Sequence, residues 1–184
     1  NSMDVFAYCA RTFAPQVRQA AGVPPLTCPP LTAEDFPISL LAGRDLIYFD
    51  LHGPFLGSDY WSGDGEVPAL TAAQVRRADL SGAVVFATNC YLGDAISPMM
   101  DALLAAGARG VIAGAGRNWS PAAGAAYGAG LLGLWVRRLL QAGAAPGPAL
   151  AIAKKRVRLS GVLNRQATLD TLGFRLFERG RTGG

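Results

Sequence analysis

Short runs of apolar residues alternate with helix-like segments along this chain, and this alternation limits the folds open to it. The runs occupy residues 4–9, 45–51, 82–89 and 110–114. Strands that are apolar throughout are typical of a sheet buried on both faces. Strands separated by helices pair in parallel through right-handed crossovers. The pattern therefore predicts an α/β fold with three layers, a mostly parallel sheet having helices on both faces.

Helix signals fill the spaces between these runs. Thr32 with Asp35, and Thr71 with Gln74, have the spacing of a capping box, and Ser97 precedes Pro98 as a cap would. The Pro-rich residues 23–31 are expected to form an extended loop, and residues 54–68 a loop or small hairpin. The remaining expectations are helices at 14–21, 32–42, 71–78, 96–106, 121–142 and 148–156, and a closing strand at 171–177.

The chain has enough apolar residues for one domain. It has 184 residues, of which 51% are hydrophobic and 16% charged, so it can bury a sizeable core. We expect a single domain over residues 3–184 and interpret Asn1 and Ser2, ahead of Met3, as a tag remnant. Residues 119–136 carry no charge, but their Ala and Gly content and the start signal Ser120-Pro121 favour a buried helix. No membrane association is expected.

Charge and cysteine content favour a cytoplasmic protein. Residues 154–184 hold eight Lys or Arg against Asp170 and Glu178, within a net charge of +4. No aromatic interleaving, zinc spacing or helix-turn-helix signal accompanies them, so we interpret them as a solvated face and expect no nucleic-acid partner. Three cysteines without a CxxC pair, and no charged-then-apolar leader, indicate a reduced, cytoplasmic chain.

One histidine and one cysteine follow buried strands. His52, the only histidine, ends the second apolar run, and Cys90 ends the third. The carboxyl ends of parallel strands share one edge of a sheet, where function gathers. An imidazole can promote ionisation of a thiol and then protonate a leaving amine. The alternative is an inert buried thiol and a histidine that caps a turn.

The order of these parts resembles a family of cysteine peptidases. Strands ending in His-Gly and in Cys, a Leu-rich helix between them, and a helix closing in Ala-Gly-Ala-Arg before a Val-Ile strand are similar to CHAT domains. These are caspase-like relatives of gingipain, clostripain and separase. The matching segments are LIYFDLHG at 46–53, LTAAQVRRADL at 70–80, VVFATNCYLGD at 84–94 and LLAAGARGVIA at 103–113.

The resemblance implies a caspase-like sandwich and a cysteine endopeptidase acting on a peptide or protein. It makes His52 the general base and acid and Cys90 the nucleophile. The backbone N–H groups of Gly53 and Cys90 would stabilise the oxyanion. No cofactor and no metal are implied.

The chain also departs from the family pattern. A bulky Tyr91 follows the nucleophile, and only one strand is expected before the His52 strand, where the family has two. An inactive caspase-like module that binds a regulatory protein partner is therefore the alternative. A nucleotide binder is disfavoured, because Gly114-Ala-Gly116 leads into Arg117-Asn118-Trp119 instead of a helix start.

Substrate selection has several candidates near the dyad. Asp94 follows Cys90 closely and would favour a Lys or Arg side chain, whereas Arg109 or Arg117 would select an acidic one. Tyr91 would shape the pocket. Trp61 and Trp119 would line a groove or pack in the core.

Overall fold

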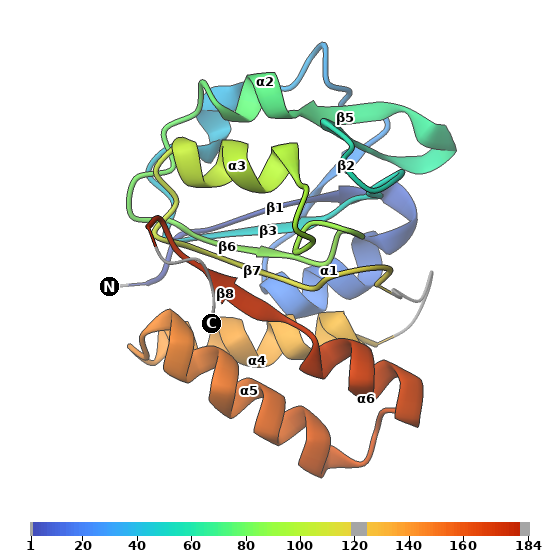
Figure 1. The fold of residues 1–184 in the computed structure, drawn as a ribbon, viewed down its shortest axis with the longest axis vertical. Helices are drawn as coiled ribbons and strands as arrows, with labels where there is room; N and C mark the ends of the chain where they lie inside the picture. The colour runs from blue at the N-terminus through green and yellow to red at the C-terminus, as the bar shows by residue number, and fades with distance from the viewer. Residues whose placement is uncertain (1, 119–124, 181–184) are drawn as a thin grey trace.

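The computed structural model describes residues 2–118 and 125–180, and in them a central sheet of six strands separates two helical layers (Figure 1). The strand order is β2-β1-β3-β6-β7-β8, with parallel pairing throughout except between β7 and β8. The strands are β1 (Val5–Ala10), β2 (Leu26–Cys28), β3 (Leu46–Asp50), β6 (Val84–Ala87), β7 (Gly110–Ala113) and β8 (Arg175–Phe177).

Helices cover both faces of the sheet, which confirms the predicted three-layer α/β fold. One layer holds α2 (Ala72–Val75), α3 (Pro98–Ala105) and the antiparallel hairpin β4 (Tyr60–Ser62) and β5 (Pro68–Thr71). The other holds α1 (Ala14–Ala21), α4 (Ala129–Gln141) and α5 (Pro146–Ser160), with α6 (Arg165–Leu172) against α4 and α5. Figure 1 shows the two layers above and below the sheet.

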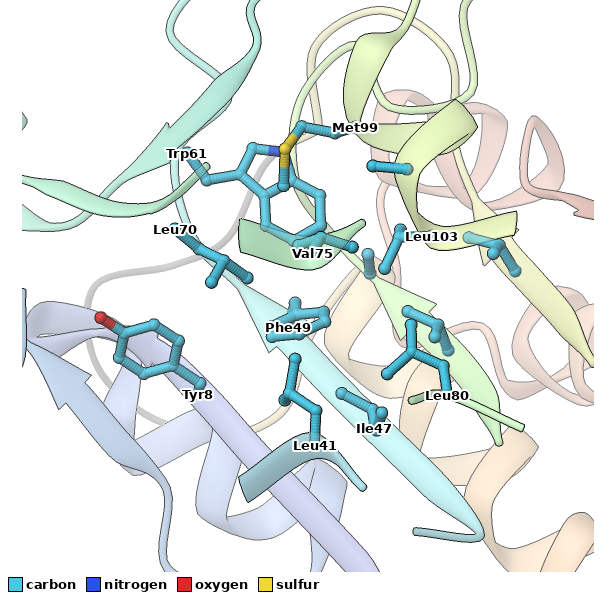
Figure 2. Close-up of a cluster of buried hydrophobic side chains, with 14 of the residues drawn as sticks. Tyr8, Leu41, Ile47, Phe49, Trp61, Leu70, Val75, Leu80, Met99 and Leu103 are labelled. Atoms are coloured by element: carbon cyan, nitrogen blue, oxygen red, sulfur yellow. The ribbon is translucent and has the colours of Figure 1, made fainter. Parts of the chain in front are cut away.

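Alternate side chains of each strand enter two separate cores. Tyr8, Ile47 and Phe49 lie in the core under α2 and α3, together with Leu70 and Leu103 (Figure 2). Their neighbours along the strands enter the core under α1 and α4. This period of two explains why the interior strands are almost entirely apolar, with Asp50 at the end of β3 as the exception.

The prediction of a helix at residues 32–42 is wrong. Only a 3₁₀ turn forms, at Ile38–Leu41. Pro37 lacks an N–H, and its ring disfavours helical geometry at Phe36. The Thr32 hydroxyl instead donates to Asp35 Oδ2 at 3.3 Å. The second capping box is confirmed, with Gln74 N–H donating to Thr71 Oγ1 at 3.2 Å, although its helix ends at Val75 and not at Ala78.

The C-terminal boundaries also differ from expectation. Residues 121–124 of the expected long helix lie outside the described residues, and residues 125–128 are not helical, because Gly128 has a φ of 53°. The next helix, α5, is longer than the expected helix at 148–156, since it spans Pro146–Ser160. The strand expected at 171–177 begins only at Arg175, because residues up to Leu172 belong to α6. The side chain of Asn164 caps the start of this helix by accepting from Ala167 N–H at 2.8 Å.

Two strands precede β3, where one was expected. Residues 26–28 lie within the expected Pro-rich loop but pair with β1 in parallel, Ala10 beside Cys28. No helix in the described ranges is both long enough and apolar enough to cross a membrane.

Candidate functional site

The two predicted catalytic residues follow adjacent parallel strands at the same distance from the last paired residues. β3 and β6 are adjacent and parallel, and their last paired residues are Phe49 and Ala87. This pair and the pair His52 and Cys90 share a separation of 38 positions. The pairing itself ends at Phe49 and Ala87, and both residues follow it by three positions, at the carboxyl edge of the sheet.

The loops after these strands are in direct backbone contact. A Cβ atom added to Gly53 would lie 2.1 Å from the carbonyl oxygen of Cys90 and 3.3 Å from its nitrogen. Real Cβ atoms do not approach backbone so closely, so only glycine fits here. Gly53 thus keeps the segment that carries His52 against the segment that carries Cys90.

His52 is exposed and held through its backbone. Its N–H donates to Ser62 O at 2.8 Å, and Ser62 N–H donates back to His52 O at 3.0 Å. The imidazole packs edgewise on the ring of Phe13, with centroids 5.2 Å apart. Phe13 ends the 3₁₀ turn Arg11–Phe13 that follows β1. The hairpin and the β1 loop together position the ring.

Cys90 is half-buried, and its sulfur contacts the loop after β7. Asn118 N–H points to Cys90 Sγ at 3.4 Å, and the thiol lies 3.6 Å from Asn118 O. The Asn118 side chain donates from Nδ2 to Asn89 O at 3.1 Å, which ties the two loops together. Among the described residues, the sulfur hydrogen-bonds with this backbone and not with the imidazole.

Tyr91 and Asp94 fix the shape of the loop after Cys90. Tyr91 has a left-handed backbone, φ 62°, and its N–H donates to Gly116 O at 2.6 Å. Such backbone strain in a side-chain-bearing residue is concentrated at functional sites. The Asp94 carboxylate accepts from Gly116 N–H at 3.1 Å. Asp94 as a substrate-binding residue stays a prediction, and the carboxylate has a structural partner in this loop.

The two arginines considered for selectivity lie in different places. Arg117 is exposed, and its Nε donates to the Tyr91 hydroxyl at 3.0 Å, which raises the pKa of the guanidinium. Arg109 precedes β7 and therefore lies at the opposite edge of the sheet from Cys90. Only Arg117 belongs to the candidate site.

Two depressions open on either side of Gly53. The first is shallow, with a free volume of about 10 Å³, and is lined by Cys90, Tyr91 and Trp61, among others. The second has a free volume of about 370 Å³ and is lined by His52, Ser62 and Glu66, among others. Gly53 lines both.

Trp61 packs in the core, and its role in substrate binding stays a prediction. Its side chain is 2% exposed and packs on Phe49, with ring centroids 5.1 Å apart, yet it lines the depression beside Cys90. Trp119 lies outside the described residues. In the described part of the chain, no three His, Cys, Asp or Glu side chains gather as metal ligands.

Phe13 and Asn118 were missed in the sequence. Asn118 follows the apolar run at 110–114, so the strand-end argument used for His52 and Cys90 points to it as well. Phe13 carries no comparable signal, because its contact with His52 depends on the pairing of β1 with β3.

Comparison with models of known families and with curated proteins found no match.

Proposed function

We propose that the chain is a caspase-like cysteine endopeptidase that hydrolyses peptide bonds with Cys90 as nucleophile and His52 as general base and acid. The contact of Gly53 with the Cys90 backbone carries the proposal, because it joins the loops that follow β3 and β6 and carry the two residues. The pairing of two strands ahead of β3 also supports it, since the resembling family has two there.

In the proposed reaction His52 takes the proton of the Cys90 thiol, and the Asn118 N–H points to the resulting thiolate. The sulfur attacks the peptide carbonyl, and the N–H groups of Gly53 and Cys90 donate to the oxyanion. The carbon–nitrogen bond breaks as protonated His52 gives its proton to the leaving amine. Water, deprotonated by His52, then cleaves the thioester and releases the acid and the thiol.

The partner in this proposal is a peptide or protein, and the chemistry needs no cofactor. We infer a cytoplasmic location, because Cys9, Cys28 and Cys90 are free thiols and thiols persist in reducing compartments.

An acylating peptide probe tests the dyad. We expect the probe to label Cys90. We expect the substitution His52→Ala to slow this labelling by about 10²–10⁴-fold, the usual contribution of a general base. Cys9→Ala is the control, because burial raises the pKa of the Cys9 thiol and keeps it unreactive. Labelling at an unchanged rate without His52 contradicts the proposal.

An inactive binding module is the second candidate. It is favoured by the hydrogen bonds of the Cys90 sulfur with Asn118 and by the separate depressions at Cys90 and His52. If iodoacetamide alkylates Cys90 independently of His52 and denatured casein stays intact, the binding module replaces the peptidase.

A further inference from the structure

The depression lined by His52 is large enough to hold an amino-acid side chain. Its free volume is about 370 Å³, within the roughly 300–1,000 Å³ of cavities that bind small ligands. Gly53, Gly63 and Gly65 line it, so backbone forms much of its wall and leaves the space open. We call it the His52 depression.

Glu66 supplies the only carboxylate that lines the His52 depression among the described residues, and no Lys or Arg of these residues lines it. Glu66 is exposed, and within the described part of the chain its carboxylate takes part in no hydrogen bond or ion pair. Asp64 and Asp94, by contrast, each accept from a backbone N–H. The Glu66 carboxylate is therefore available to pair with a cation that enters the depression.

The loop at residues 63–67 is tied to the sheet. Asp64 Oδ2 accepts from the N–H and from the hydroxyl of Thr12, both at 2.9 Å. A Cβ added to Gly63 would lie 2.2 Å from Cys28 O, so this backbone lies directly against the end of β2. The loop thus presents its acidic side chain from a backbone that is held at two points.

The His52 depression lies next to the residue that follows the cleaved bond. In the proposed reaction the imidazole gives its proton to the leaving amine, and the two nitrogens must come within about 2.6–3.2 Å of each other. That amine belongs to the residue after the cleaved bond, and its Cα carries the side chain. The space beside the imidazole is therefore the space that this side chain reaches. The depression beside Cys90, with a free volume of about 10 Å³, has no room for it.

Resting on the proposed peptidase activity, we propose that the His52 depression binds a Lys or Arg side chain on the residue after the cleaved bond, with the Glu66 carboxylate as its partner. The charged head pairs with the carboxylate, and the apolar stem lies along the glycine-lined wall. Because Glu66 is exposed, the preference is modest. Ion pairs at exposed sites change binding by up to about fivefold.

Sequencing of the cleavage sites in a denatured proteome tests this selectivity. Mass spectrometry identifies the residue after each bond that the protein cleaves and that its Cys90→Ala variant leaves intact. We expect Lys and Arg to be enriched at this position by about two- to fivefold over their frequency in the proteome. If they occur there at background frequency or below it, the inference is overturned and the peptidase proposal stands.

Charge variants at Glu66 test whether this carboxylate is responsible. Glu66→Gln removes the charge with little change of shape, and we expect it to abolish the enrichment. Glu66→Lys reverses the charge, and we expect a preference for Asp and Glu at the same position. Glu34→Gln is the matched control, because Glu34 is also exposed but does not line the depression, and it should keep the wild-type profile. Equal profiles in Glu66→Gln and the wild type exclude this carboxylate as the determinant.

The failure of the proposed function has a different result. If the wild type cleaves no bond that the Cys90→Ala variant leaves intact, the peptidase proposal and the selectivity fall together. Cleavage that depends on Cys90 but shows no preference after the cleaved bond removes the selectivity alone.

Discussion

Gly53 is the residue on which the candidate site depends most directly. Its backbone lies against Cys90 with no room for a side chain. We expect Gly53→Ala to separate the two loops, to destabilise the fold by about 1–3 kcal/mol as overpacking does, and to slow labelling of Cys90. Chemical denaturation and the labelling rate measure the two effects.

Gly147→Ala is the matched control for that substitution. Gly147 lies in the first turn of α5, where a Cβ would be 3.8 Å from Leu176 Cδ2, an ordinary contact. Alanine favours helix over glycine, but a Cβ in the residue before Pro148 disfavours helical geometry, so we expect stability to change by no more than about 0.5 kcal/mol and labelling to stay unchanged. If Gly53→Ala behaves in the same way as Gly147→Ala, the contact of Gly53 with Cys90 does not constrain the site.

The sequence allowed the prediction of His52 and Cys90 because both follow buried strands, a local signal. It could not show that the Cys90 sulfur hydrogen-bonds with Asn118, because that contact joins residues 28 positions apart through the pairing of β6 with β7. Local patterns identify the residues at the rim, and pairing decides which of them touch.

At the scale of elements, two similar capping patterns have different outcomes. Thr71 and Gln74 exchange hydrogen bonds at the start of α2, and Gln74 also donates to Ala33 O. We expect Thr71→Ala to lower the free energy of unfolding by about 1 kcal/mol, as the loss of a cap does. Urea denaturation of the purified protein measures this change.

Thr32→Ala is the comparison for Thr71→Ala. The Thr32 hydroxyl donates to the exposed Asp35 carboxylate, and the next element is a 3₁₀ turn instead of an α-helix. We expect a change within roughly 0.5 kcal/mol, typical of surface substitutions. An equal loss in both variants would mean that the hydroxyl of Thr71 contributes nothing as a cap.

The wrong boundaries share a physical origin. Pro37 prevents a helix that the capping pattern at Thr32 favours, and the Asn164 cap starts a helix that runs to Leu172, into the expected strand. In each case a single residue outweighs the average preference of its neighbours. The interior strands, by contrast, were predicted correctly because their apolar runs are uninterrupted.

At the scale of the whole molecule, the candidate site stands on the centre of the sheet. β3 and β6 occupy the two middle positions, and every residue in both strands is buried. The edge strands β2 and β8 each have exposed residues. Sites on rigid elements hold catalytic geometry better than sites on mobile ones.

This arrangement predicts a gradient of amide hydrogen exchange. Opening the middle of the sheet exposes both cores, so amides of β3 and β6 should exchange only through global unfolding. Amides of β2, β8 and α6 should exchange sooner, through local opening. Exchange followed by mass spectrometry, with mild denaturant to identify global opening, measures the order. If β8 is protected as long as β3, the sheet opens as one unit, and the rim that carries His52 and Cys90 has no special rigidity.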